Sequence, residues 1–171
     1  RTNSVPGSGS SKAEIFIIGE GPGFNEDQQG LPFVGRSGKL LDELLTSIPM
    51  TREEVFITNV VKCRPPDNRD PLPDEVAACR TYLEHQMELL DPKVVVTLGR
   101  VSMLRFHPKG KISQAHGKIL EWGGRILFPL YHPAAGLRNP TIKRELQKDV
   151  LKLPEALRQA NRVSPKKATA K

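Results

Sequence analysis

Three polar residues stand where apolar runs of this 171-residue chain end, and their types suit the recognition of a polar ligand. Glu20 is a carboxylate inside the glycine-rich turn GEGPG at residues 19–23, and Asn59 lies within the apolar run 55–61. A buried amide is costly unless it is paired, so Asn59 either caps an internal group or offers a ligand one donor and one acceptor. His132 follows the last apolar run and directly precedes Pro133.

Each of these residues also has a plainer explanation: Glu20 as a solvated loop acid, Asn59 as a satisfied core amide, and His132 as a loop histidine before proline. All three nevertheless lie towards the carboxyl ends of predicted strands, Asn59 within its strand and the other two after theirs, and in an open α/β sheet these ends meet at one crevice. Their convergence favours a ligand site there. The turn is neither a phosphate loop nor a dinucleotide fingerprint, because no Gly-Lys-Ser/Thr closes it and an insert separates Gly23 from the next helix.

The elements that must position these residues alternate between strands and helices. Strand-length apolar runs occur at residues 14–18, 55–61 and 94–99, and a fourth strand region, ILEW with RILFPLY, occurs at 119–131. Helical patterns occur at residues 37–48, 74–90, 99–106 and 139–157, with a loop at 107–117 and a kink at Pro154. This alternation predicts an α/β fold, a three-layer αβα sandwich with a mostly parallel central sheet of about four strands.

Length and composition indicate the size of the domain and the cellular location of the protein. With 37% hydrophobic residues and 15 prolines, the chain suits one loop-rich domain over residues 1–160. No apolar run approaches the roughly 20 residues that span a membrane, no signal peptide is visible, and two cysteines make no secreted disulfide framework. We therefore expect a cytoplasmic protein without a membrane segment. Residues 161–171 lack acids and are predicted to form a disordered basic tail.

Three motifs together resemble one known family. GEGPG with the downstream ED and PFVG is followed by TNVVKCRPP with NR, and then by YHPAAGLRNP. In this order, and at domain-wide spacing over about residues 1–153, they resemble the family 4 uracil-DNA glycosylases. These are the iron–sulfur members of the uracil-DNA glycosylase superfamily. The resemblance implies a DNA repair enzyme that flips uracil out of DNA and hydrolyses its N-glycosidic bond, leaving an abasic site.

The resemblance also implies roles for residues of the pocket. Glu20 would position or activate water, or steady positive charge on the sugar, and His132 would donate to uracil O2. Asn59 would read the O4 and N3–H edge of the base, on which Phe33 would stack. Glu26 would lie beside C5, where it would crowd a thymine methyl group. The turn glycines would keep the pocket tight and contact the substrate; they are Gly19, Gly21 and Gly23.

A DNA-contacting segment follows His132 in the same resemblance. It is expected to enter the minor groove, with Leu137 or Arg138 filling the gap that the flipped base leaves in the stack. The residues expected to contact DNA are Pro133, Ala134, Leu137, Arg138 and Asn139. The expected partner is uracil-containing DNA, and the protein is expected to act as a monomer.

The iron–sulfur cluster is the point on which this sequence departs from the family. Family members bind a [4Fe–4S] cluster through four cysteines, and Cys63 and Cys79 match the second pair. The first pair, a C-x-x-C, normally lies just upstream of the segment matching Arg1. Because the chain begins with Arg rather than Met, we expect that this pair was trimmed rather than lost. Nothing in the spacing of His107 and His116 favours them as replacement ligands, and both are interpreted as loop histidines.

Two other functions stay open at this stage. One superfamily group crosslinks covalently to the abasic site through a histidine in a basic loop. Residues 109–116, KGKISQAH, are basic but lack the paired arginines expected there. The other is a non-catalytic nucleic-acid-binding domain with a degenerate pocket, against which intact Glu20, Asn59 and His132 argue.

Overall fold

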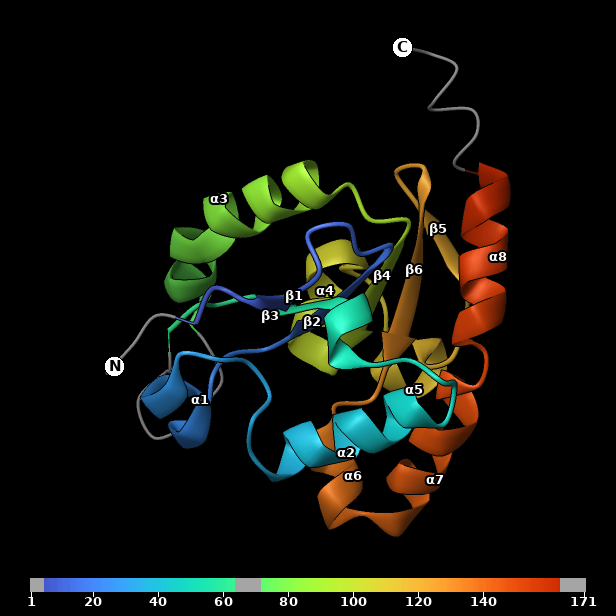
Figure 1. The fold of residues 1–171 in the computed structure, drawn as a ribbon, viewed down its shortest axis with the longest axis horizontal. Coiled ribbons are helices and arrows are strands. Elements are labelled where there is room, and N and C mark those ends of the chain that lie inside the picture. The colour runs from blue at the N-terminus through green and yellow to red at the C-terminus, as the bar shows by residue number, and fades with distance from the viewer. Residues whose placement is uncertain (1–4, 64–71, 164–171) are drawn as a thin grey trace.

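Four parallel strands form the middle of the molecule (Figure 1). The structure is a computed structural model and describes residues 5–63 and 72–163. In spatial order the parallel strands are β3 (Phe56–Asn59), β2 (Ile15–Gly19), β4 (Val94–Leu98) and β6 (Arg125–Leu130). Two short strands flank them antiparallel, β1 (Ser8–Gly9) beside β3 and β5 (Leu120–Trp122) beside β6. The predicted parallel sheet of about four strands is confirmed, and the edge strands raise the sheet to six.

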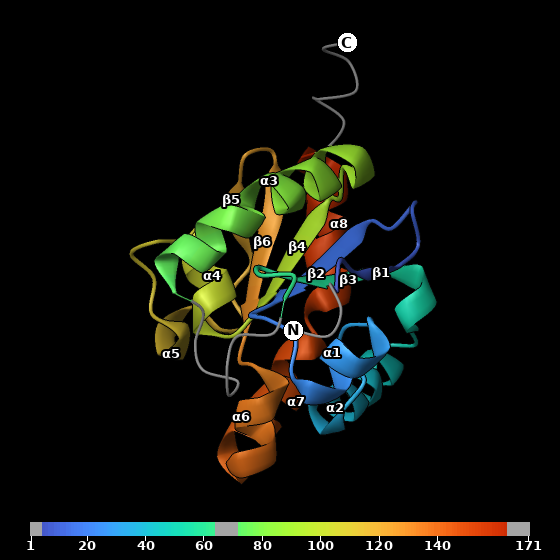
Figure 2. The ribbon, with the colours of Figure 1, turned by 90° about the vertical axis from the view of Figure 1, so that its left-hand side faces the viewer.

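Helices cover both faces of the sheet, which gives the three predicted layers (Figures 1 and 2). One face packs against α2 (Arg36–Thr46), α7 (Pro140–Val150) and α8 (Leu153–Val163), and the other against α3 (Pro73–Leu90) and α4 (Arg100–Phe106). The strands are buried on both sides because their apolar residues run continuously. Successive side chains of β2 therefore enter opposite cores, Ile15 and Ile17 the first, Phe16 and Ile18 the second.

Four shorter helices lie in the connections and were not predicted from apolar periodicity. They are α1 (Phe24–Gln29), the 3₁₀ helix η1 (Arg52–Glu54), α5 (Ile112–Ala115) and α6 (Pro133–Arg138). The loop expected over 107–117 therefore contains one helical turn. Among the described residues, no helix is both long and apolar enough to cross a bilayer.

The C-terminal helical region also differs from the prediction. Instead of one helix kinked at Pro154, α7 ends at Val150 and α8 begins at Leu153. Pro154 is then the second residue of a new helix, where a missing N–H costs no hydrogen bond. α8 continues past residue 160 to Val163 and buries Ala160, so the helix crosses the expected start of the tail, while residues 164–171 lie outside the described part.

Candidate active site

The predicted pocket residues meet at the carboxyl ends of three parallel strands. Gly19 ends β2 and lies in register with Asn59, which ends β3. The ladder between the two strands continues one step further, because Val60 N–H donates to the Gly19 carbonyl at 2.9 Å and Val61 N–H to the Glu20 carbonyl at 3.1 Å. His132 follows β6, so the sheet brings all three predicted chemical groups to one edge.

The backbone at Gly19 lies directly against Asn59 and Phe33. A Cβ at position 19 would lie 2.5 Å from Asn59 Oδ1 and 2.6 Å from Cζ of Phe33. Both neighbours are buried, Asn59 being 1% exposed and Phe33 5%. Only glycine lets the amide and the aromatic ring lie this close to the turn. Within the described residues, Asn59 Oδ1 has no hydrogen-bond partner, and a buried unpaired carbonyl oxygen is the arrangement expected of a ligand acceptor.

His132 is held in a defined tautomer. Its Nδ1 accepts a hydrogen bond from Ala134 N–H at 3.0 Å and so caps the N-terminus of α6. Burial and, to a smaller extent, the nearby Arg138 charge lower the pKa of His132 to about 4, with Glu26 partly opposing them. With Nδ1 accepting, the proton of the neutral ring sits on Nε2, which leaves Nε2–H available as a donor. The ring stacks on Phe33, with centroids 5.7 Å apart.

We expect the His132 ring to stay neutral throughout the physiological pH range. Its pKa of about 4 lies below the ordinary 6.5, so the unfolded chain binds this proton more readily than the folded one. The contribution of His132 to stability is therefore present above pH 6.5 and is lost as pH falls towards 4. An NMR titration of the His132 ring, assigned with His132→Asn, measures this value. An inflection near 6.5 would contradict the assignment.

Glu26 contacts the backbone of two segments. Its Oε1 accepts from Gly23 N–H at 2.9 Å, and its Oε2 accepts from Val34 N–H at 3.1 Å and Gly35 N–H at 3.0 Å. A Cβ on Gly23 would lie 2.7 Å from Oε1. The carboxylate thus ties the glycine turn to the segment that carries Phe33, in addition to any contact with a ligand. Of the remaining turn residues, Gly21 is half-buried.

The predicted DNA-contacting residues belong to α6 and its end. Pro133 is buried at the first turn, Ala134 donates the capping hydrogen bond, and Leu137, 38% exposed, lies beside exposed Arg138. Asn139 caps α7 by accepting from the N–H groups of residues 141 and 142, as its position before a proline predicted. One apolar and one cationic side chain are therefore exposed at the end of α6.

Comparisons with known proteins identify the family of this chain. The family model described as the uracil DNA glycosylase superfamily matches residues 6–154. The chain belongs to the uracil-DNA glycosylase superfamily.

Its curated relatives identify the group within that superfamily. A type-4 uracil-DNA glycosylase of Sulfurisphaera tokodaii is 46% identical, over 99% of this chain and 79% of the relative. A type-4 uracil-DNA glycosylase of Saccharolobus solfataricus is 52% identical, over 92% of this chain and 77% of the relative. One of Archaeoglobus fulgidus is 47% identical, over 91% of this chain and 82% of the relative. The resemblance of the three motifs to the type-4, or family 4, members is confirmed.

The two cysteines of this superfamily member lie at the junction of β3 and α3. Lys62 N–H donates to Cys79 Sγ at 3.3 Å, which brings Cys79 next to the chain segment that carries Cys63. Lys62 Nζ donates to Thr58 Oγ1 at 2.5 Å and to the Asn59 carbonyl at 2.8 Å. Burial lowers the pKa of Lys62 to about 7, against the opposing effect of Cys79. Two thiols and an amide donor suit one half of a four-thiolate ligand set; the sequence holds no further cysteine.

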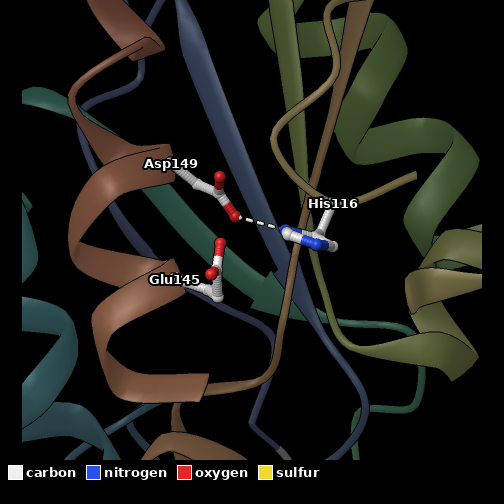
Figure 3. Close-up of side chains that lie close together, drawn as sticks. All are labelled: His116, Glu145 and Asp149. Atoms are coloured by element: carbon white, nitrogen blue, oxygen red, sulfur yellow. Dashed lines mark hydrogen bonds and ion pairs between the residues drawn. The ribbon is translucent and has the colours of Figure 1, made fainter. Parts of the chain in front are cut away.

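A second polar cluster lies between α7 and the end of α5 (Figure 3). His116, predicted to be a loop histidine, bonds through Nδ1 to Oδ2 of buried Asp149 at 2.7 Å, and Glu145 lies beside them on α7. The imidazole also packs on Tyr131, with ring centroids 4.5 Å apart. These residue types could hold a divalent cation, but the His116 nitrogen nearest the acids is already bonded to Asp149. The pair joins α7 to the strand end that precedes His132.

Proposed function

We propose that this chain removes uracil from DNA by hydrolysing the N-glycosidic bond, which releases uracil and leaves an abasic site for base excision repair. One observation carries the proposal: the buried, unpaired Oδ1 of Asn59 beside Phe33 and the His132 ring. An amide at the end of a rigid strand offers both a donor and an acceptor to a planar base edge. Membership of the superfamily and the type-4 relatives support the same reaction.

In this proposal the pocket acts on a base that has left the duplex. A base is unreachable inside the stack, so it is extruded and read by hydrogen bonds and stacking. Asn59 accepts from uracil N3–H and donates to O4, while Phe33 stacks on the ring. Neutral His132 donates Nε2–H to O2, where negative charge develops as the bond breaks. Glu20 positions the attacking water or steadies the positive charge on the sugar.

Specificity and DNA contact follow from the surrounding residues. Gly19, Gly21 and Gly23 line the base with backbone, and Glu26 beside C5 excludes a methyl group. Leu137 or Arg138, from the exposed end of α6, fills the gap in the base stack, with support from the backbone of Pro133, Ala134 and Asn139. Apolar wedges of this kind hold kinked DNA in other minor-groove proteins. Uracil-containing DNA is thus the proposed partner.

We further propose that Cys63 and Cys79 are two of the four ligands of a [4Fe–4S] cluster. The cluster would tie the end of β3 to α3 as a structural cross-link, and no step of the reaction passes through it. Because every group proposed to read the base comes from one chain, we propose a monomer. We also propose a cytoplasmic location, a glycosylase domain over residues 1–160 and a basic tail over 161–171.

Replacing Cys79 with serine tests the cluster. In full-length protein, Cys79→Ser is expected to lower bound iron and to abolish the visible absorbance of the cluster, because a hydroxyl is a poor substitute for a thiolate. Ala78→Ser adds the same hydroxyl at the exposed neighbouring position and should leave both unchanged. Iron analysis and a visible spectrum of each protein give the answer. Equal iron in both variants would exclude Cys79 as a ligand.

The proposed activity is tested with oligonucleotides that contain a single uracil. After incubation with the protein, hot alkali should cleave the uracil strand and leave matched thymine and cytosine strands intact. A covalent protein–DNA band on a denaturing gel would instead indicate the crosslinking activity. Binding without alkali-labile sites would indicate a non-catalytic domain. Either result would overturn the proposal.

A further inference from the structure

The segment that carries Phe33 is held in an unusual backbone conformation. Phe33 has φ of 51°, a left-handed conformation that a bulky side chain seldom adopts, yet its ring is buried against Gly19 and His132. Such conformations persist only where the surrounding structure over-determines them, and they concentrate at ligand clamps. The contacts that impose this conformation are therefore part of the pocket.

Arg52 supplies those contacts on the carbonyl side of the segment. From η1, its guanidinium donates to the carbonyl of Pro32 at 2.9 Å, to that of Phe33, and to that of Gly38 at 3.3 Å. Its Nε donates to Asp42 Oδ1 at 2.5 Å, so the fork is oriented by a carboxylate on α2. One side chain thus binds the carbonyl groups of the peptide bonds before and after Phe33.

The neighbouring residues fit around this clamp. A Cβ at Gly38 would lie 1.9 Å from the Phe33 carbonyl oxygen, so this glycine is what lets that carbonyl turn towards the guanidinium. On the opposite side, the amides of Val34 and Gly35 donate to Glu26. The Arg52 cation therefore binds the carbonyls of Pro32 and Phe33, and the Glu26 carboxylate binds the amides of the two residues that follow.

We propose that Arg52 is a positioning residue for base recognition: by holding the carbonyls of Pro32, Phe33 and Gly38, it fixes the Phe33 ring where it stacks on the extruded base. This inference rests on the proposed stacking role of Phe33. Arg52 touches neither the substrate nor the reacting atoms and acts only through the Phe33 backbone. A planar fork with several donors is required, because an ammonium can serve only one of these acceptors well.

A double-mutant cycle separates this role from general stability. Single-turnover excision of uracil from a single-stranded oligonucleotide is measured for Arg52→Met, Phe33→Ala and the double variant, with thermal melting of each. Arg125→Met is the matched control, because Arg125 likewise bonds a carboxylate, Asp91 at 2.7 Å, and a prolyl carbonyl, Pro92 at 2.8 Å, at the other end of the sheet. Arg52→Lys keeps the charge without the fork and serves if the methionine variant does not fold.

The expected pattern is non-additive. Phe33→Ala should lower the rate about tenfold to a hundredfold, the scale of losing one base–aromatic stack. Arg52→Met should lower it by a similar factor and Arg52→Lys by less, while Arg125→Met lowers melting temperature but not rate. In the Phe33→Ala background, Arg52→Met should cost less than about threefold more.

Three results would overturn the inference, and they differ in whether the stacking role of Phe33 survives. If Phe33→Ala is impaired while Arg52→Met is as fast as Arg125→Met, or if the two losses multiply, Arg52 does not act through Phe33. If Phe33→Ala excises uracil at the wild-type rate, the proposed stacking role itself fails, and the inference fails with it.

Discussion

Replacing Asn59 with aspartate is expected to slow uracil excision by at least about a thousandfold, because sites built to pair with a polar substrate reject a mismatch by about 10⁴–10⁵. The wild-type amide can accept from N3–H and donate to O4 of uracil. A carboxylate keeps the shape but offers only acceptors, so O4 faces a negative oxygen in a site that is 1% exposed. If the carboxyl is protonated, it can instead serve cytosine, whose N3 is an acceptor and whose C4 amino group is a donor.

The measurement compares Asn59→Asp with wild type on matched oligonucleotides containing uracil or cytosine. Asn161→Asp is the control for the added charge, because Asn161 lies on α8 and contacts Lys93 at 2.7 Å. That control should retain the wild-type rate. Near-normal uracil excision by Asn59→Asp would show that Asn59 does not read the base.

The second large effect is expected at His132. Removing its Nε2–H donor should lower the single-turnover rate about 10²–10³-fold, the scale of losing one oxyanion donor. Substrate binding should change much less, because the charge on O2 exists only near the transition state. Excision rates and affinity for an uncleavable uracil analogue measure the two quantities separately.

Two variants are needed to separate the loss of the Nε2–H donor from the loss of the helix cap, because His132 Nδ1 also accepts a hydrogen bond from Ala134 N–H. His132→Ala removes both functions, whereas His132→Ser keeps a capping oxygen but cannot reach the base. Equal losses in the two variants would assign the effect to the missing donor. Recovery of most of the rate in the serine variant would mean that His132 serves only to cap α6.

The sheet and its pocket could be predicted because their signals are local. Runs such as VVVTLG are mostly apolar and do not alternate with charged residues, which marks doubly covered strands, and the carboxyl ends of such strands must meet. That rule alone predicts that Glu20, Asn59 and His132 lie at the same edge of the sheet. The helix start at Asn139-Pro140 could also be predicted, because the Asn139 cap and the fixed φ of Pro140 both act within the first turn of the helix.

The parts that could not be predicted depend on contacts between distant residues. Helix α1 has no apolar stripe, and Glu26 within it bonds amides eight and nine residues away. The left-handed Phe33 gives no sequence signal, because the usual signal is glycine. Arg52 lies in a three-residue 3₁₀ turn without a motif, and its carbonyl partner on Pro32 is 20 residues away. Such roles emerge only when packing brings the segments together.

The two short antiparallel strands cover the two edges of the parallel sheet. Open edges of apolar sheets template the addition of strands from other molecules. Here β1, two residues long, covers β3, and Gly9 within it runs so close that a Cβ would lie 1.9 Å from the Val55 carbonyl oxygen. On the far side, β5 covers β6 with three residues and turns the exposed charge of Glu121 outward. Across the described residues, the four parallel strands are thus interior to the sheet, and strands of only two and three residues form its edges.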